Sequence, residues 1–558
     1  MSWLRPAHTP MKIQYMMKYL QLLISLLVGM VSYAQTFNNP VLPFDYSDPD
    51  VCAVGKDYYL TASSFNCSPG LPILHSCDLV NWTIINYALD TVPNAYCHDG
   101  KVAHGKAVWA PSIRYHKGMY YILWGDPDIG IFMVSTTDPT SRWSDPVTII
   151  PGKGFIDPCP LWDDDGKLYV AYALAASRAN TNSVIFIQQL NPQDWRKKGM
   201  PILAYDGTYD DSQMALTKAV NHTIEGPKLY KHNGFYYIFA PAGGVDKGWQ
   251  LALRSKNVFG PYESKVVMMQ GTTNINGPHQ GGWVETPSGE SWFMHFQEKQ
   301  PFGRVVHLNP VKWVDNWPVV GNDPEGKGWG EPLASCNMPN AQKSDLKIQM
   351  NDEFDSTQLG LQWQWQANYE PWFGSTSNLG FMRIYSCILG EQVNNMFDVP
   401  NMLLQKIPST GCVATANVKI VAKDEQCRSG IVVMGLDYAA LLIQKRGNKL
   451  CLALATCINA EEGNGERVDI ITDFKPDKSY NTGATSNAEL NIQLRVKIDS
   501  NGKCQFAYST DGKRFREIAK TFQAREGKWI GAKMGLFSMT TSQTTRGWID
   551  CDWFHVEM

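Results

Sequence analysis

A short phrase recurs five times in the first half of the chain, and it limits the fold more than any other feature. Each copy is a turn glycine followed by an aromatic-rich strand pattern: VGKDYYL, HKGMYYI, DDGKLYV, HNGFYYI and SGESWFM. The glycines are Gly55, Gly118, Gly166, Gly234 and Gly289. They lie roughly 50 to 70 residues apart, with no long amphipathic helix pattern between them. The repeat predicts a five-bladed β-propeller, whereas the alternative of a two-sheet sandwich leaves the regular repetition unexplained.

The repeat stops near residue 330, and the remaining sequence predicts a second all-β domain. We expect the propeller over residues 35–330, a polar, Pro-containing linker over 331–346, and a β-sandwich over 347–558. Two hairpin signals support the sandwich, Asn501-Gly502 and Asp511-Gly512. The fold class is therefore expected to be all-β with two domains, which also suits a chain of 558 residues.

The N-terminus has the pattern of a signal peptide. Lys18 precedes an apolar stretch over residues 19–31, and the small residues Ser32 and Ala34 surround a cut after Ala34. The apolar stretch is too short to be assigned as a membrane span. We therefore expect residues 1–34 to be removed, leaving no membrane span, and the protein to be exported to the periplasm or the cell exterior.

Composition excludes some classes of partner. Lys and Arg total 50 against 53 Asp and Glu, so the net charge of −3 offers no basic surface for nucleic acid. The 19 Trp, 24 Tyr and 22 Phe suit both β-structure and stacking against sugar rings.

The 13 cysteines are odd in number and include no CxxC pair, so a zinc ribbon is not indicated. The sequence leaves open whether one or two disulfides form, and it assigns no pairing.

Three acidic residues recur at the same place in different repeats. Asp48 lies in YSDPDV, Asp157 in GFIDPCPLW and Glu225 in HTIEGPKLY, each about seven to nine residues before its turn glycine. This spacing places all three near the same end of the inner strands, at the propeller axis. Hydrolysis of a glycosidic bond needs such a set, because a protonated acid serves the leaving oxygen while an ionised carboxylate activates water or attacks the sugar.

A second acidic cluster has a simpler explanation. Asp163, Asp164 and Asp165 directly precede the turn glycine Gly166. Acidic side chains are common in such turns because they hydrogen-bond the local backbone. We therefore interpret this cluster as a structural turn rather than as a metal site.

The order of these segments resembles a known family. NPVLPFDYSDPDV, VWAPSIRYHKGMYYI, FIDPCPLWDDDGKLYVAY, IEGPKLYKHNGFYYIF and GPHQGGWVETPSGESWFMHFQ together resemble glycoside hydrolase family 43, the propeller-fold β-xylosidases and α-L-arabinofuranosidases. NDEFDSTQLGLQWQWQ and RGWIDCDWFHVE are similar to the concanavalin-like sandwich found in one branch of that family. The resemblance thus covers essentially the whole mature chain.

The resemblance implies roles for the three acids. Asp48 matches the general base, Glu225 the general acid, and Asp157 the residue that raises the pKa of the acid and orients it. Similar enzymes invert the anomeric carbon, which implies carboxyl groups roughly 6.5 to 9.5 Å apart with water between them. Such a mechanism requires no cofactor.

Further residues match family positions around the sugar. Phe65 and Trp109 match the walls of the terminal-sugar pocket, and Arg304 matches a guanidinium that hydrogen-bonds sugar hydroxyls. His279 matches a histidine near the axis, placed beside the substrate or towards a bound calcium ion. Each has a structural alternative: the aromatic residues as core, the arginine as a solvated strand end, and the histidine as a structural residue without metal.

The expected function is an exo-acting glycosidase that removes terminal xylose or arabinofuranose from xylo- or arabino-oligosaccharides. In the segment NYEPWFGS, Trp372 or Phe373 is expected to reach the propeller mouth from the second domain. The alternatives are a non-catalytic carbohydrate-binding propeller and an endo-acting arabinanase. The two sugars present similar hydroxyl groups to the same pocket, so the sequence leaves the choice between them open.

Overall fold

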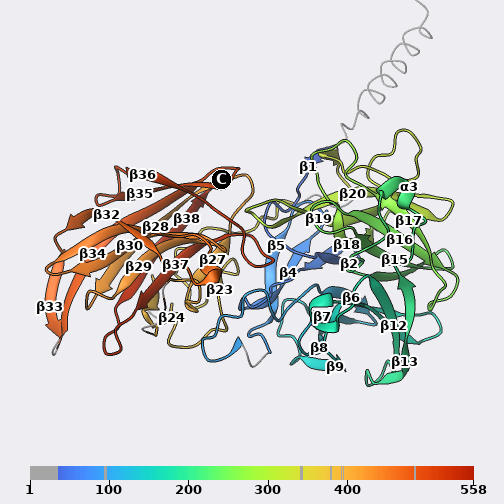
Figure 1. Cartoon of the computed structure of the whole chain (residues 1–558), viewed down its shortest axis with the longest axis horizontal. Coiled ribbons are helices and arrows are strands. Elements are labelled where there is room, and N and C mark those ends of the chain that lie inside the picture. Colours follow the sequence, from blue (N-terminus) through green and yellow to red (C-terminus); the bar gives the residue numbers. More distant parts are fainter. Residues whose placement is uncertain are drawn as a thin grey trace, which may run out of the picture.

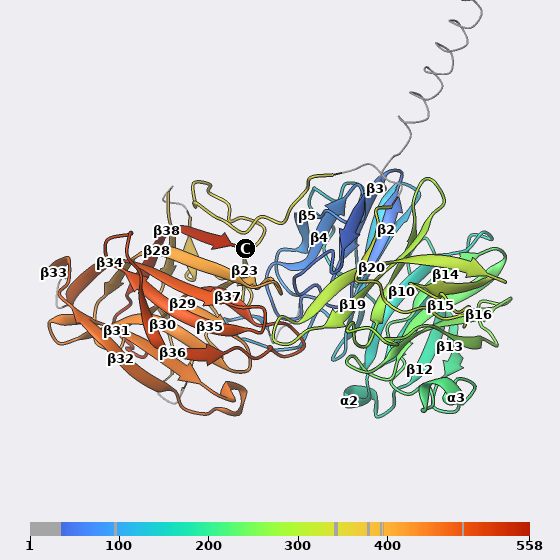
Figure 2. The same ribbon diagram turned by 90° about the horizontal axis from the view of Figure 1, so that it is seen from above.

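The computed structural model shows two β domains packed side by side (Figures 1 and 2). It describes residues 35–93, 97–339, 344–376, 380–390, 393, 395–482 and 485–558. The predicted signal peptide lies outside these residues. The helices are short: α2 (Ala176–Ala179), α3 (Met214–Thr217) and the 3₁₀ turn η2 (Ala460–Glu462). Within the described ranges, no helix has the length and apolar character needed to cross a membrane.

The N-terminal domain is a five-bladed propeller, as the repeat predicted. Each blade is a four-stranded antiparallel sheet whose strands follow chain order. Blades 1 and 2 contain β2 (Asp50–Val54), β3 (Asp57–Thr61), β4 (Gly70–Ser76), β5 (Thr83–Leu89), β6 (Ser112–His116), β7 (Met119–Asp126), β8 (Gly130–Thr136) and β9 (Val147–Pro151). Blades 3 and 4 contain β10 (Phe155–Trp162), β11 (Leu168–Leu174), β12 (Val184–Leu190), β13 (Lys197–Asp206), β14 (Lys228–His232), β15 (Phe235–Ala242), β16 (Trp249–Ser255) and β17 (Glu263–Met268). Blade 5 contains β18 (His279–Glu285), β19 (Ser291–Glu298), β20 (Arg304–Val314) and β21 (Trp317–Val320).

The first strands of successive blades meet around the axis. β2 packs against β6, β6 against β10, and β10 against β14. β18 packs against β15 of blade 4 and against β2 of blade 1, which closes the ring. Apolar side chains fill the spaces between neighbouring blades. Ile73 and Trp124 belong to the cluster between blades 1 and 2, and Ile187 and Leu251 to the cluster between blades 3 and 4. Burial of these strand faces holds the blades together.

The five repeated glycines have a common structural cause. Each lies in the hairpin that joins the first and second strands of its blade, with φ between 63° and 86°. A Cβ atom at any of them would meet nothing within 4 Å. The left-handed backbone conformation, rather than lack of space, therefore favours glycine at these positions.

The C-terminal domain is a sandwich of two sheets. The first sheet has the order β23-β27-β37-β29-β30-β31-β32 with β26 beside β37, and the second has the order β24-β25-β38-β28-β34-β35-β36 with β33 beside β34. The first sheet contains β23 (Gln364–Trp365), β26 (Cys387–Ile388), β27 (Leu403–Lys406), β29 (Arg428–Met434), β30 (Tyr438–Arg446), β31 (Lys449–Cys457), β32 (Arg467–Phe474) and β37 (Lys533–Thr540). The second contains β24 (Gly374–Ser375), β25 (Met382–Tyr385), β28 (Cys412–Ala422), β33 (Lys478–Thr482), β34 (Thr485–Ile498), β35 (Lys503–Ser509), β36 (Arg516–Gln523) and β38 (Trp548–Glu557). Both predicted hairpins are confirmed, between β34 and β35 and between β35 and β36.

The two domains share an extensive junction. β1 (Thr36–Asn38) pairs with β22 (Ser335–Asn337), so part of the segment predicted as a linker forms a strand with the N-terminal end of the propeller. One apolar cluster contains propeller residues such as Phe302 together with sandwich residues such as Trp365. A Cβ atom on Gly303 would lie 2.5 Å from the backbone nitrogen of Gly531, so a sandwich loop lies directly against the propeller.

Candidate active site

The structure brings the three recurring acids together in one pocket at the propeller axis. Asp48 lies just before β2, Asp157 lies within β10, and Glu225 lies shortly before β14. The pocket has a volume of about 100 Å³. It is lined by Asp48, Phe65, Trp109, Ala110, Ile156, Asp157, Glu225, Val245, Gln280, Arg304 and Trp529. Acids from blades 1, 3 and 4 therefore share a cavity sized for a small ligand.

Backbone irregularities aim several of these side chains into the pocket. Asp48 and Asp157 have φ values of 55° and 57°, a left-handed conformation that aspartate tolerates better than most residues. The pairing of β10 with β11 shifts register around Asp157, and the pairing of β18 with β19 shifts around Gln280. Such bulges redirect a side chain out of the regular alternation of a strand. β10 of blade 3 and β18 of blade 5 each contain such a bulge at the pocket.

The Asp48 carboxylate is held by two donors. The Ser63 hydroxyl donates to Oδ2 at 2.6 Å, and Arg304 Nη1 donates to Oδ1 at 2.8 Å. Both Asp48 and Arg304 are buried. Asp45 in turn accepts a hydrogen bond from the Arg304 backbone N–H at 2.9 Å. These contacts orient the carboxylate and place a cation beside it, which suits a group that must carry negative charge.

Glu225 is the acid best suited to hold a proton near neutral pH. Burial raises its pKa to about 8, and the neighbouring Asp157 and Asp48 carboxylates add to this rise. Burial likewise raises the pKa of Asp157 to about 7, with a further contribution from Asp48. Three carboxyl groups that lie close together in a site with little water cannot all be ionised readily. The pocket therefore separates a protonated acid from an ion-paired carboxylate.

Gly226 links the two acids with raised pKa values. Its backbone N–H donates to Asp157 Oδ2 at 2.8 Å, and it directly follows Glu225 in the chain. Its φ is 58°, and a Cβ atom there would lie 2.7 Å from the side chain of Gln280. Both the backbone conformation and the close approach require glycine at this position. Asp157 thus holds the segment that carries Glu225.

The predicted aromatic residues do line the pocket. The ring centroids of Phe65 and Trp109 lie 6.5 Å apart in an edge-on arrangement. Trp109 Nε1 donates to the Gly105 carbonyl oxygen at 3.0 Å, which fixes the indole. Arg304 also lines the pocket, where its visible role is to hold Asp48.

The structure places His279 beside the pocket rather than in its lining. It is fully buried, and both ring nitrogens lack a hydrogen-bond partner among the described residues. Burial, and then the Arg304 charge, lowers its pKa to about 3, so the imidazole is neutral. The next residue, Gln280, faces the cavity instead, and its Nε2 is buried without a partner in the described part of the chain.

The protein side chains around His279 do not by themselves build a calcium site. Calcium prefers six to eight oxygen ligands, whereas His279 offers a neutral nitrogen. Among the described residues, no cluster of three or more potential His, Cys, Asp or Glu ligands includes it. A calcium ion there would need water as its main ligand.

Sequence reasoning missed one wall of the pocket, Trp529. This residue lies in the sandwich loop between β36 and β37, is 47% exposed, and has its ring centroid 6.4 Å from that of Trp109. The expectation that Trp372 or Phe373 fills this role is wrong, because neither lines the pocket and Phe373 is buried in the sandwich core. An aromatic residue between two glycines in the loop segment EGKWIGAK is the signal that was available.

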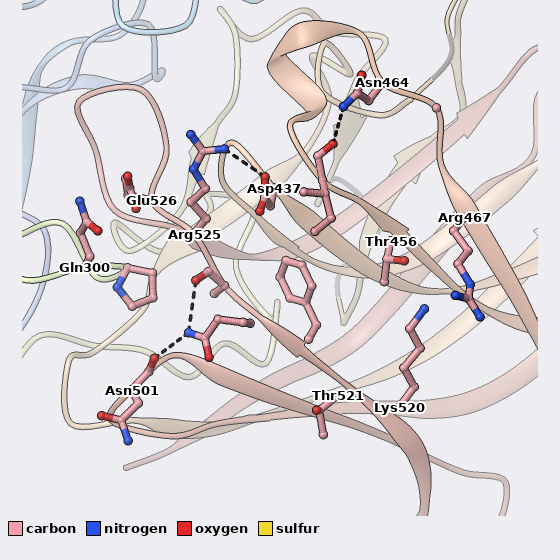
Figure 3. Close-up of a pocket in the computed structure, with 16 residues that line it drawn as sticks. Gln300, Asp437, Thr456, Asn464, Arg467, Asn501, Lys520, Thr521, Arg525 and Glu526 are labelled. Carbon is pink, nitrogen blue, oxygen red and sulfur yellow. Dashed lines mark hydrogen bonds and ion pairs between the residues drawn. The ribbon is translucent and has the colours of Figure 1, made fainter.

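A larger hollow lies on the sandwich near the junction (Figure 3). Its volume is about 1,010 Å³, and its walls include Gln300 of the propeller and Arg525 of the sandwich. Figure 3 shows Arg525 paired with Asp437, at 3.3 Å. None of the three axial acids lines it. The smaller axial pocket is therefore the candidate active site, because it gathers two buried acids with raised pKa values beside an ion-paired carboxylate.

Comparisons with known proteins identify the family and agree with the fold. The family model for glycosyl hydrolases family 43 matches residues 37–318, and the model for the beta xylosidase C-terminal concanavalin A-like domain matches residues 351–557. A putative beta-xylosidase of Xylanibacter ruminicola is 32% identical over 503 residues, covering 90% of this chain and 86% of that protein. A non-reducing end alpha-L-arabinofuranosidase of Bacteroides ovatus is 28% identical over 572 residues, covering 96% and 98%.

Solved structures show the same architecture. The crystal structure of a xylan beta-1,4-xylosidase from Bacillus halodurans superposes with a TM-score of 0.79 at 21% identity, over 94% of this chain and 100% of that one. At this sequence identity the match shows similarity of fold alone. The family models and the relatives together show that this chain belongs to glycosyl hydrolases family 43 and is a glycoside hydrolase with a C-terminal concanavalin A-like domain.

Proposed function

We propose that the protein is an exo-acting, inverting glycosidase that removes terminal β-D-xylosyl or α-L-arabinofuranosyl residues from plant cell-wall polysaccharides or their oligosaccharides. The observation that carries this proposal is the small axial pocket, in which two acids with raised pKa values face an ion-paired carboxylate. Trp529 covers one side of the pocket from the second domain, which favours binding of a chain end over an open groove.

The mechanism follows from the chemistry of the three acids. Asp48 accepts a proton from water as the water oxygen bonds to the anomeric carbon, and Glu225 gives its proton to the glycosidic oxygen as that bond breaks. Asp157 keeps Glu225 protonated and in position. Attack opposite to the leaving group inverts the anomeric carbon. The Arg304 guanidinium and the Gln280 amide, which both line the pocket, are the polar groups that meet sugar hydroxyls.

The names of the relatives favour neither of the two sugars. They include a putative beta-xylosidase and a non-reducing end alpha-L-arabinofuranosidase, at about the same coverage. We further propose that the mechanism uses no cofactor, that calcium beside His279 is at most structural, and that the signal peptide directs the protein out of the cytoplasm.

The test is release of p-nitrophenol from the β-D-xylopyranoside and from the α-L-arabinofuranoside. The parent is compared with Glu225→Gln and Asp48→Asn, since asparagine tolerates the left-handed backbone at position 48 whereas alanine adds strain. Asp145→Asn serves as control, because its side chain is 87% exposed and distant from the pocket lining. We expect turnover of at least one substrate, lost in Asp48→Asn and kept in the control. Because p-nitrophenolate leaves with little help from an acid, Glu225→Gln should lose more activity on xylo- and arabino-oligosaccharides than on the aryl glycosides.

The stereochemical part is tested separately by following the first-formed sugar anomer with proton NMR. Appearance of the opposite anomer agrees with inversion, and the retained anomer contradicts it. A folded parent that is silent on both aryl glycosides and on short xylo- and arabino-oligosaccharides would overturn the proposed activity.

A further inference from the structure

Three donor atoms of different chemistry meet on blade 1, at a place that the proposed hydrolysis does not use. His75 Nε2 lies 2.8 Å from Asp57 Oδ1. Cys77 Sγ lies 3.7 Å from the same oxygen and 4.0 Å from His75 Nε2. In the part of the chain that the structure describes, this is the only group of three or more His, Cys, Asp or Glu side chains whose donor atoms converge so closely.

The strand register explains why these residues meet. β3 and β4 are antiparallel neighbours, with Tyr59 opposite His75 and Tyr58 opposite Ser76. One further step in this register brings Asp57 opposite Cys77. Because alternate residues share one face of a sheet, Asp57 and Tyr59 lie on the same face as His75 and Cys77. The ring of Tyr59 packs against that of His75 at 5.4 Å and restricts the imidazole.

We propose that Asp57, His75 and Cys77 bind one divalent transition-metal ion of the Zn²⁺ class, with water as the fourth ligand. Thiolate, imidazole and carboxylate are the side chains that zinc takes in proteins. Tetrahedral zinc places its ligand atoms about 3.3 to 3.6 Å apart. The three separations range from 2.8 to 4.0 Å, so the ion requires only small side-chain shifts.

The surroundings allow an ion to enter and balance its charge. The side chains of His75 and Asp57 are 21% and 34% exposed, so solvent reaches the donors without a domain movement. Zinc is bound by the thiolate form of cysteine, so the Cys77 thiol gives up its proton when the metal binds. Binding releases that proton to water, and the Asp57 carboxylate and the Cys77 thiolate then neutralise the two charges of the ion.

Two further charged residues face the cluster. Lys56 adjoins Asp57 in the β2–β3 turn, and Asp78 directly follows Cys77 in the chain. All thirteen cysteines carry free thiols, and of these only Cys77 and Cys336 are partly exposed. Cys336 lies on β22 near the domain junction and has no such partners among the described residues, which makes it a matched control.

The proposed site is structural rather than catalytic. β3 runs from Asp57 to Thr61 and leads on to Ser63 and Phe65 of the pocket. A strand of this length separates the cluster from the pocket by about 15 Å or more. An ion that binds only the folded state stabilises it by mass action. We therefore expect Zn²⁺ to raise the thermal midpoint and to leave kcat unchanged.

The experiment is a Co²⁺ titration of the full chain after chelator treatment and desalting. Thiolate ligation produces a sulfur-to-cobalt charge-transfer absorption, and excess Zn²⁺ should abolish it. We expect one equivalent per chain in the parent and in Cys336→Ser. Cys77→Ser should lose the absorption, and His75→Ala should bind at least about tenfold more weakly.

Thermal midpoints with and without Zn²⁺ provide a second readout that does not depend on the thiolate band. The parent and Cys336→Ser should rise, whereas Asp57→Asn and Cys77→Ser should not. Circular dichroism verifies that each variant is folded. An absorption that survives in Cys77→Ser, its absence from the parent, or equal loss in Cys336→Ser would each overturn the proposal.

Discussion

Asp157 and Asp163 lie at the two ends of strand β10, and their carboxyl groups have opposite electrostatics. Asp157 is buried, whereas Asp163 is half-buried as a residue although only 4% of its side chain is exposed. Burial raises the pKa of Asp157 to about 7, and the Asp48 charge adds to it. Burial also acts to raise the pKa of Asp163, but hydrogen bonds from Lys231 and Tyr236 outweigh it and hold the pKa below its usual range.

The difference shows that burial alone does not make an acid functional. Asp163 pairs with Lys231, which also lies 2.9 Å from Asp164, so its charge is neutralised locally. Asp157 faces other carboxyl groups and, among the described residues, accepts a hydrogen bond from the backbone N–H of Gly226. A raised pKa at a buried carboxyl group therefore depends on the charges of its neighbours as much as on its burial.

Substitution of Glu225 is expected to have the largest effect on catalysis. Like Asp157, Glu225 has a pKa that burial raises. Glu225→Gln cannot protonate the leaving oxygen, so we expect kcat on unactivated oligosaccharides to fall about 10²- to 10⁴-fold. Steady-state kinetics with xylo- and arabino-oligosaccharides measure this change. Retention of more than a tenth of the parent activity would contradict the assigned role.

The same variant makes a prediction about stability. Because burial raises the pKa of Glu225 to about 8, ionisation of this group costs folding free energy as pH rises from the unfolded pKa of about 4.3 through that value. Glu225→Gln should therefore melt above the parent at pH 9 and with it at pH 4. A lower melting temperature at pH 9 would argue against a buried acid.

Asp157→Asn is expected to have the next largest effect. Removal of its charge should lower the pKa of Glu225 and shift the alkaline limb of the kcat/KM profile towards acid by roughly one pH unit. Loss of orientation should also reduce kcat about 10- to 100-fold. The pH profile is the decisive measurement, since a merely structural role would lower activity without moving that limb.

Asp163→Asn should have the smallest effect on catalysis and a measurable effect on stability. Loss of its charged hydrogen bonds should reduce the free energy of unfolding by about 1 to 3 kcal/mol, with kcat unchanged. Since the folded pKa is depressed, this contribution is present above the unfolded pKa of about 3.9 and is lost as pH falls below it. Melting curves of parent and variant should thus converge at low pH, whereas a change in kcat would contradict the comparison.

Local rules account for what could be predicted. The five turn glycines are visible in the sequence because a left-handed hairpin position selects glycine whatever surrounds it. The sequence could predict that Asp48, Asp157 and Glu225 lie together, because a repeat places equivalent residues at equivalent ends of the inner strands. The turn role of Asp163 to Asp165 followed from their position before Gly166, and the Asp163 N–H does donate to the Lys167 carbonyl oxygen within that turn.

Long-range packing accounts for the features that could not be predicted from the sequence. Trp529 reaches the pocket from a loop of the second domain, and no local pattern specifies which sandwich loop meets the propeller. At His279 and Gln280, a bulge decides which of two adjacent side chains lines the cavity, and this depends on the pairing of β18 with β19. The convergence of Asp57, His75 and Cys77 likewise depends on the register between two strands.

The sequence by itself determined the number of blades, the presence of a second β domain and the identity of the three acids, because these follow from repetition and from backbone conformations that few residues tolerate. Only the tertiary structure decided how burial and neighbouring charges raise the pKa values of Asp157 and Glu225, which loop covers the pocket and how Asp48 is held. Those properties arise from distances between groups that are far apart in the chain, and charge interactions depend on such distances and on the exclusion of water.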